Sequence, residues 1–278
     1  MRRTLAALVA TLALCPIGGR AGEPEPAPAA QPAPAAQPAA QPAPAPAAAA
    51  PKLSAKEMLD RMDANNNGYD DMTLDEKLTV IDTTGTKKSY DMTVQQKGDT
   101  KRLINFTSGE MKGMATLIEA KDSVYVWLPG FKKVRRVAAH NMNQTLAGSD
   151  MSNEDSSITL WSKDWEPKLD KEDETSYWLA LTPKAGHDSE YAKVVHRVAK
   201  DTFCQMETHY YGKTGEKIKQ MINTDPVDWN GSKHWMNKVV TITDARTGHK
   251  TILETKSCKA NAGLKDDLFT VRQLQWGK

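Results

Sequence analysis

Most of the chain after residue 72 alternates between apolar and polar positions with a period of two. This alternation is typical of strands that bury one face, and turn residues such as Gly85 and Gly98 separate the alternating runs. We expect strands at 74–81, 90–96, 101–106, 115–119, 124–128, 178–181, 193–199, 203–211, 217–223, 238–243, 251–256 and 269–274. Successive hairpins of this kind form an antiparallel meander.

Helical signals occur near residue 54 and somewhere within residues 138–162. Ser54 can cap a helix through Glu57, and three apolar residues then follow at helical spacing on one face: Met58, Leu59 and Met62. The pattern therefore predicts an α+β protein with one large twisted antiparallel sheet and helices on one side.

The predicted end of the first helix imitates a calcium-binding loop. Asp63, Asn65 and Asn67 stand at relative positions 1, 3 and 5, but position 12 is Leu74, where a bidentate Glu is needed, and no second helix follows. We interpret the segment as a helix C-cap with a turn rich in Asn, and we predict no metal site.

Two predicted strands, 124–128 and 177–181, are apolar or aromatic on both faces. Val124, Val126 and Leu128 point to one side of the first strand, while Tyr125 and Trp127 point to the other. Two interpretations remain open. Covering helices and a loop could bury both faces as ordinary core, or the sheet could curve around an apolar cavity for acyl chains.

The first 21 residues have the pattern of a secretory signal. Two arginines precede an apolar run at 5–14, which is too short to span a bilayer. Gly19 and Ala21 are the small residues that signal peptidase requires, so we predict cleavage after Ala21 and a periplasmic protein.

Cys15 leaves open a lipoprotein signal, in which an acylated cysteine becomes the new N-terminus. The residue before that cysteine should be small, and here it is Leu14. We therefore favour the cleaved, soluble form.

Composition divides the rest of the chain into two parts. Residues 22–52 are almost entirely Ala, Pro, Gln and Glu, so they cannot bury enough apolar area to fold. We predict that they form a disordered linker. Residues 53–278 have globular composition without another low-complexity break, which predicts one folded domain.

The charge balance argues against nucleic-acid binding. The chain has 37 Lys and Arg residues against 35 Asp and Glu; loss of residues 1–21 removes three arginines and no acid, which leaves 34 against 35 and a net charge of −1. Without a dense basic run interleaved with aromatic residues, we expect no nucleic-acid partner.

The sequence contains none of the common catalytic motifs. It has no Gly-x-Ser-x-Gly, His-Glu-x-x-His or Cys-x-x-Cys motif, and its six histidines are scattered. Asp150 and Asp155 could be an acid–base pair, but a capping turn explains them equally well. We therefore expect neither an enzyme nor a cofactor.

Cys204 and Cys258 are the cysteines that remain after signal removal, both in predicted strands. In an oxidising compartment an intramolecular disulfide between them is the economical interpretation, and two buried thiols are the alternative.

One block of motifs resembles a known family. Leu128-Pro129, the basic run 132–136, the turn 148–150 and the acids at 154 and 155 are similar to the outer-membrane lipoprotein-sorting proteins of the LolA-like superfamily, and the segments 194–201, 206–211 and 215–219 resemble later strands of that family. The resemblance implies a half-barrel of about eleven antiparallel strands, with helices over the hydrophobic groove on its concave face.

The resemblance also implies a function and its residues. We expect lipoprotein or lipid cargo, an inner-membrane exporter, an outer-membrane acceptor and transient membrane contact. Cargo-binding candidates are Val124, Tyr125, Val126, Trp127, Leu128, Pro129, Met151 and Trp178. Gating or motif candidates are Arg135, Arg136, Gly148, Ser149, Asp150 and Asp155.

Two functions remain open at this point. The protein is either a carrier that moves acyl chains from the inner towards the outer membrane, or a non-catalytic lipid-sensing or scaffold module of an envelope complex. Neighbours on a strand point to opposite faces, so one of Arg135 and Arg136 could line the groove and pair with Asp150 or Asp155, unless both arginines stay solvated.

Overall fold

The computed structural model describes residues 52–120, 123–146, 148–157, 160–229 and 231–276. The chain divides by its contacts into two units, Met1–Ala50 and Pro51–Lys278, and every element described below belongs to the second unit. The predicted signal and most of the predicted linker lie outside the described residues.

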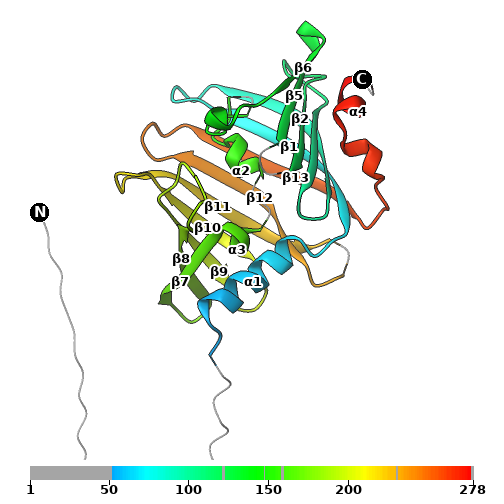
Figure 1. Cartoon of the computed structure of the whole chain (residues 1–278). Helices are drawn as coiled ribbons and strands as arrows, with labels where there is room; N and C mark the ends of the chain where they lie inside the picture. Colours follow the sequence, from blue (N-terminus) through cyan, green and yellow to red (C-terminus); the bar gives the residue numbers. More distant parts are fainter. Residues whose placement is uncertain (1–51, 121–122, 147, 158–159, 230, 277–278) are drawn as a thin grey trace, which may run out of the picture. The chain divides into compact units, whose positions relative to one another are not determined.

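One open antiparallel sheet dominates the folded unit (Figure 1). Its thirteen strands are β1 (Asp71–Ile81), β2 (Lys87–Lys97), β3 (Lys101–Phe106), β4 (Ala115–Ala120), β5 (Ser123–Leu128), β6 (Lys133–Arg136), β7 (Trp165–Glu172), β8 (Ser176–Pro183), β9 (Lys193–Ala199), β10 (Gln205–Tyr211), β11 (Lys217–Asp228), β12 (Trp235–Asp244) and β13 (Lys250–Ala260). The spatial order is β6-β5-β4-β3-β2-β1-β13-β12-β11-β10-β9-β8-β7. The predicted α+β class with one large antiparallel sheet is confirmed.

The sheet consists of two meanders that meet at its centre. Strands β1 to β6 and strands β7 to β13 each pair with their neighbours in the chain, and β1 pairs with β13 to join the two sets. The register of the junction shifts between Asp75 and Glu76, and a bulge of this kind increases local twist and bending. We call the inner face of the curved sheet the concave face.

Short helices lie on both sides of the sheet. In the described residues they are α1 (Ala55–Asn66), α2 (Asn153–Ser157), α3 (Trp161–Asp164) and α4 (Val271–Trp276), with 3-10 turns η1 (Pro129–Phe131), η2 (Ala139–Asn141) and η3 (Asp266–Phe269). Figure 1 shows α1, α2 and α3 on the inner side of the curve and α4 on the outer side. No helix of the described part is long and apolar enough to cross a membrane.

Helix α1 begins and ends as the sequence predicts. The side chain of Ser54 accepts a hydrogen bond from the backbone N–H of Glu57, and the Glu57 carboxylate accepts one from the backbone N–H of Ser54. The apolar stripe of α1 packs against β7, α3 and the inner side chains of β8 and β9. The buried cluster consists of Met58, Leu59, Met62, Trp161, Trp165, Leu179, Leu181, Tyr191, Val194, Val198 and Tyr210.

The residues that imitate a calcium loop have structural partners. The Asp63 carboxylate accepts hydrogen bonds from the backbone N–H groups of Trp161 and Ser162 at the start of α3. Asn65 exchanges two hydrogen bonds with the backbone of Trp235, and the N–H of Asn67 caps α1 by bonding the Asp63 carbonyl. The C-cap interpretation is confirmed.

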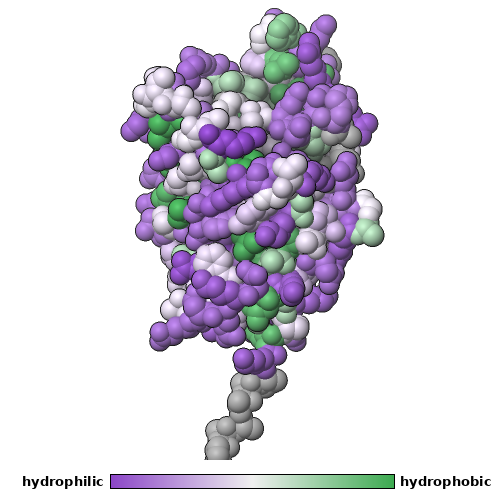
Figure 2. All heavy atoms as spheres, turned by 90° about the vertical axis from the view of Figure 1, so that its left-hand side faces the viewer, coloured by the Kyte–Doolittle hydropathy of each residue, from purple (hydrophilic) through white to green (hydrophobic). Residues whose placement is uncertain are grey.

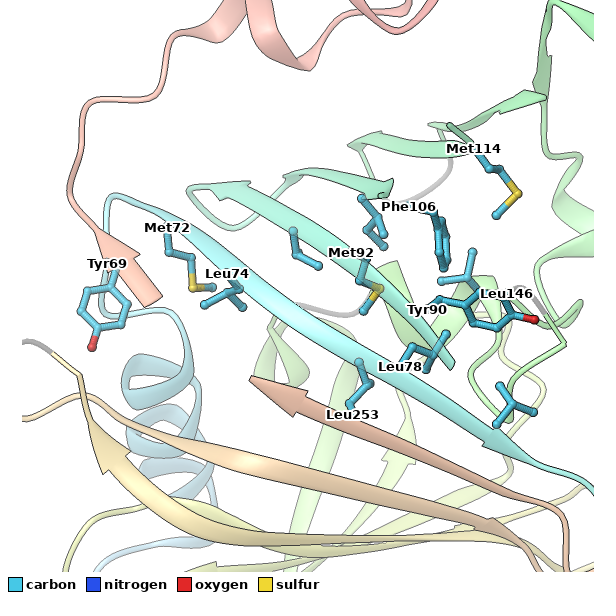
Figure 3. Packing of buried hydrophobic residues seen from close by; sticks show 13 residues of the cluster. Tyr69, Met72, Leu74, Leu78, Tyr90, Met92, Phe106, Met114, Leu146 and Leu253 are labelled. Carbon is cyan, nitrogen blue, oxygen red and sulfur yellow. The ribbon is translucent and has the colours of Figure 1, made fainter. Parts of the chain in front are cut away.

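A second buried cluster covers the concave face of β1, β2, β3 and β13. Figure 3 shows Met72, Leu74 and Met92 projecting from β1 and β2 into a common layer with Tyr90 and Phe106. Further methionines, Met111, Met151 and Met236, pack against this layer while only partly buried. Thioether side chains fill irregular space and rearrange easily, so this layer is more adaptable than an aliphatic one.

A third cluster lies on the opposite face of β3, β4 and β5, under α4. Leu103, Leu117 and Trp127 point outward from these strands and pack against Phe269 and Leu274. The C-terminal segment therefore buries the outer face of the strand that the sequence shows to be apolar on both sides.

Three elements differ from the predictions. Strands β6 and β7 were not expected. Strand β6 is a short edge strand of mostly charged, exposed residues, and β7 alternates apolar and charged residues but has Pro167 in its interior, which argues against a strand. The segment 269–274, predicted as a strand, instead ends η3 and forms most of α4, because Phe269 and Leu274 share the outer cluster.

The predicted disulfide is not formed, and both cysteines are free thiols. Cys204 is buried beside β10 and its sulfur accepts a hydrogen bond from Asn237 Nδ2, whereas Cys258 lies on β13 opposite Leu74. Strands β11 and β12 lie between β10 and β13, so the two thiols are not neighbours in the sheet. Burial raises the pKa of Cys204 to about 11, which makes this thiol unreactive at neutral pH.

Candidate functional site

A cavity of about 220 Å³ opens on the concave face near the junction of the two meanders. It is bounded by the end of α1, by β1 to β3, by β10 and β11, and by the segment that carries α2 and α3. The residues lining this central cavity are Asn66, Asn67, Met72, Gln96, Arg102, Met151, Asp155, Trp161, Gln205, Tyr210, Met221 and Asn223.

One wall of the central cavity is cationic. Arg102 donates from Nη2 to Gln96 Oε1 at 2.7 Å and from Nη1 to the Ser156 carbonyl at 2.6 Å, which ties β3 to the end of α2. Burial lowers the pKa of Arg102 and raises the pKa of Glu76, whose carboxylate also accepts a hydrogen bond from Thr255. Their opposite charges reduce the cost of burying either group.

The α2 segment, which we define as residues 148–157, is fastened to the sheet by a buried ion pair. Lys219 of β11 pairs with the Asp155 carboxylate, and both side chains are almost fully buried, at 6% and 5% exposure. The hydroxyl of Tyr191 donates to the same carboxylate at 3.0 Å. Lys219 also lies 4.8 Å from the ring centre of Tyr210, a cation–π distance that stabilises a desolvated ammonium.

The start of the α2 segment is fastened to β13. The Asp150 carboxylate lies 2.9 Å from His249 Nδ1 and accepts a hydrogen bond from Thr251 Oγ1 at 2.7 Å. Gly148 has a positive φ of 72°, which allows the chain to turn sharply before this contact. The α2 segment is thus held at both ends across the concave face.

A second pocket of about 340 Å³ borders the start of the α2 segment. This mouth pocket is lined by Val80, Asp82, Thr86, Lys88, Tyr90, Glu110, Met111, Gly148 and His249. Since Gly148 lines the mouth pocket and Met151 lines the central cavity, the α2 segment borders both spaces.

The wall opposite Arg102 holds buried amide groups. Asn223 donates to the Gln205 carbonyl at 2.8 Å, but its Oδ1 is buried without a hydrogen-bond partner in the described structure. A buried acceptor without a partner is costly and is satisfied by a ligand donor or by water. The cavity therefore offers methionine and aromatic surface together with polar groups, which suits an amphiphilic molecule better than a purely apolar one.

Three of the predicted site residues line these two spaces. Met151 and Asp155 contact the central cavity, and Gly148 contacts the mouth pocket. Ser149 is buried within the same turn, where its hydroxyl accepts from the Met151 N–H. Asp150 does not line either pocket; it pairs with His249, in place of the arginine partner that we expected.

The predicted apolar strand is divided between the two faces of the sheet. Val126 and Leu128 pack against the concave layer, and Val124 shares their face. Trp127 and Tyr125 belong to the outer cluster under α4, which corrects the expectation that they line the groove. For this face of the strand, the interpretation as ordinary core therefore holds, and the C-terminal segment provides the cover.

Trp178 also faces away from the concave side. Its ring lies 4.8 Å from Lys171 Nζ and 5.8 Å from the Arg197 guanidinium, and its indole N–H donates to Asp173. Leu179, the next residue on β8, points inward to α1. The expectation of a cargo contact at Trp178 is therefore corrected.

Pro129, Arg135 and Arg136 lie together at the β5–β6 hairpin, outside both pockets. Pro129 begins η1, and the two arginines are exposed on the edge strand β6. Among the described residues no cluster of three or more His, Cys, Asp or Glu side chains is arranged to hold a metal ion.

Sequence reasoning missed most of the polar lining of the central cavity. Gln96 and Arg102 occupy inward positions in strands whose other inward residues, Val94 and Ile104, are apolar. Polar residues at positions that should be buried were the available signal for this site.

A family model described as "-like: Uncharacterized protein" matches residues 98–276. A comparison with curated proteins found no match.

Three solved structures have the same fold, and this chain covers almost the whole length of each. A domain described as a candidate outer membrane lipoprotein-sorting protein from Vibrio parahaemolyticus has a TM-score of 0.73 at 21% identity, covering 80% of this chain and 98% of that one. A DUF1329 family protein from Desulfovibrio piger has a TM-score of 0.74 at 23% identity, with 79% and 97% covered. A LolA superfamily protein from Nitrosomonas europaea has a TM-score of 0.67 at 20% identity, with 79% and 98% covered.

Proposed function

Because the chain belongs to the family whose model matches residues 98–276 and has the fold of the LolA superfamily, we propose that it is a non-catalytic periplasmic carrier of an acylated amphiphile. The cargo is the acyl part of a lipoprotein or a lipid, taken from an inner-membrane exporter and passed towards an outer-membrane acceptor. The observation that carries this proposal is the central cavity, which lies on the concave face beneath a short segment fastened by polar contacts.

The chemistry of the lining supports an amphiphilic cargo. Met72, Met151 and Met221 provide adaptable apolar surface for acyl chains of different shape. Arg102 and the open acceptor of Asn223 provide sites for a polar head, such as an ester carbonyl, a phosphate or an amide N–H. Asp155 is the one carboxylate in the described lining, and its contacts with Lys219 and Tyr191 fasten the α2 segment, so we assign the cavity to binding.

The size of the cavity sets a condition on loading. Pockets for small organic ligands usually measure about 300–1,000 Å³, whereas this one measures about 220 Å³. We therefore infer that the α2 segment moves aside when cargo enters, which would merge the central cavity with the mouth pocket of about 340 Å³. Fastening by a few side chains, rather than by strand pairing, suits a segment that opens.

The decisive experiment is to identify lipid that stays with the protein purified from its own periplasm, by native mass spectrometry. Met221→Asp places a carboxylate in the central cavity and should abolish retained lipid. Ile222→Asp is the matched control, because this neighbour on β11 is 44% exposed on the opposite face and should leave lipid bound.

A transfer assay separates the two non-catalytic functions. Lipid that passes to acceptor vesicles supports the carrier, whereas stable binding to an envelope protein without transfer supports the sensing or scaffold module. Wild-type protein that retains no lipid, or equal retention by both aspartate variants, would refute the cavity as the cargo site.

A further inference from the structure

The hairpin between β5 and β6 forms an exposed projection at one edge of the sheet. Strand β5 ends at Leu128, the turn η1 follows, and β6 begins at Lys133, which pairs with Leu128. Lys132 has a φ of 49°, a left-handed conformation that tightens the tip. We call residues 129–136 the basic hairpin.

Phe131 is the most exposed large apolar side chain of the described residues, at 67% exposure. It packs against no buried cluster; its described contact is with the Arg135 guanidinium, which lies 5.6 Å from the ring centre. Single exposed apolar residues are common on protein surfaces, so Phe131 is informative here because it stands at a hairpin tip among exposed basic side chains.

The surroundings of Phe131 are strongly basic. Lys132, Lys133, Arg135 and Arg136 are all exposed, and the sequence has no Asp or Glu from residue 123 to residue 149. Basic residues on an edge strand also prevent sheet-to-sheet aggregation, which accounts for part of this charge. That role does not account for an aromatic residue at the tip.

An aromatic tip surrounded by Lys and Arg matches the chemistry of an anionic membrane surface. Aromatic rings settle at the headgroup level, while basic side chains are attracted to acidic phospholipids. Figure 1 shows the β5–β6 end projecting beyond the rest of the sheet, and Figure 2 shows apolar atoms beside strongly hydrophilic ones at that upper end.

We infer that the basic hairpin docks the protein on a bilayer that contains anionic phospholipid, with Phe131 inserted among the headgroups. The hairpin continues directly from β5, whose inner residues Val126 and Leu128 pack against the concave methionine layer. Docking there would bring that layer to the membrane. The purpose of docking rests on the proposed carrier function, but the docking itself can be measured without cargo.

The test is co-sedimentation of the full secreted protein with phosphatidylethanolamine vesicles that either contain or lack phosphatidylglycerol. Binding should require phosphatidylglycerol and weaken as salt is raised. Phe131→Ser should weaken binding about tenfold, through loss of the inserted ring. Lys132→Gln and Lys133→Gln should each weaken it about fivefold, and Phe131→Trp should strengthen it.

Matched control variants distinguish binding through the basic hairpin from non-specific hydrophobic or electrostatic binding. Ile222→Ser removes the other exposed large apolar side chain, and Lys213→Gln with Lys250→Gln removes two exposed charges elsewhere; none should change binding. Equal binding by wild-type and Phe131→Ser protein, or binding independent of phosphatidylglycerol, would overturn the inference. So would a Phe131-dependent interaction with an envelope protein alone.

The docking and carrier proposals can fail separately. Met221→Asp should lose retained lipid yet bind vesicles normally, whereas Phe131→Ser should retain lipid yet bind vesicles weakly. The opposite pattern would assign vesicle binding to the cavity instead of the hairpin.

Discussion

At the residue scale, the ammonium group of Lys219 is buried, and one carboxylate and two aromatic rings offset the cost of removing its charge from water. Lys219→Met keeps the length of the side chain but leaves the Asp155 carboxylate buried without its counter-charge. We expect the free energy of unfolding to fall by about 3–5 kcal/mol. Urea denaturation of the purified protein measures this loss.

The double variant Asp155→Asn with Lys219→Met provides the control for that prediction. Removing both charges should recover a large part of the stability, because no unpaired ion then remains. Strictly additive losses would show that the two side chains do not interact in solution.

His196 predicts a pH dependence of stability. Its ring is fully buried, its Nδ1 shares a hydrogen bond with Thr208, and burial lowers the pKa of the imidazole to about 3 from its usual 6.5. Below pH 6.5 the unfolded chain binds a proton that the folded chain excludes, so this residue destabilises the fold progressively as the pH falls from 6.5 towards 3. The cost reaches about 3 kcal/mol at pH 4.

His196→Gln should flatten this acid slope when unfolding is followed by calorimetry between pH 7 and pH 4. Glu154 and Asp63 act in the opposite direction, because burial raises their carboxyl pKa values and the folded state gains protons first. The two acids are present in both proteins, so the difference in slope reports His196. An unchanged slope would mean that the imidazole is protonated within the fold.

The site was only partly predictable at this scale. The sequence identifies the turn at 148–150 and Asp155 as a unit, because small and acidic residues gather there. It cannot show that Asp155 pairs with Lys219, since the two positions are brought together by a register that local patterns do not contain. The interaction of His249 with Asp150 is hidden for the same reason.

At the element scale, α4 and η3 form the outer layer of the sheet. Leu274 lies on the buried side of α4, at 2% exposure, and packs in the cluster that contains Trp127. Leu274→Ala should lower the free energy of unfolding by about 2–4 kcal/mol through the cavity it creates. Retained lipid should not change, because α4 covers the face opposite the central cavity.

Gln273→Ala is the control for the α4 prediction. This neighbouring side chain is exposed, so its removal should change stability by less than about 0.5 kcal/mol. Equal effects of the two substitutions in thermal denaturation would contradict packing of α4 through Leu274.

Elements that bury a face in the core were predictable from the sequence, and exposed or very short elements were not. Interior strands such as β1, β3 and β9 bury at least one face against a core, and this requirement imposes the alternation that the sequence displays. The edge strand β6 carries no such requirement, whereas β7 buries Trp165 and part of Leu169 but is interrupted by Pro167. Helix α4 is short, and of its described side chains only Val271 and Leu274 join the outer cluster; two apolar positions in so short a segment can fit either period.

At the scale of the whole molecule, the two faces of the sheet differ: one carries the cavity, and the other is covered by a helix. The concave face holds the methionine layer, the polar cavity and the α2 segment, whereas the outer face of β3 to β5 is sealed by α4. The resemblance to lipoprotein-sorting proteins anticipated the curved sheet with inner helices. It did not anticipate the outer cover, which gives Trp127 a packing role; under the proposed carrier function, cargo then has only the concave side.

The pairing of β1 with β13 has a consequence for how the chain acquires this shape. Leu74 lies opposite Cys258, so the central seam joins segments from the two ends of the folded unit, and contacts of such high sequence separation form slowly. The first meander can complete its own hairpins as soon as its strands are available, yet its strand β1 keeps an unpaired edge until residues 250–260 join it. Until that moment the future floor of the cavity is an open template for aggregation, and a partner that binds the unfolded chain would protect it best at β1.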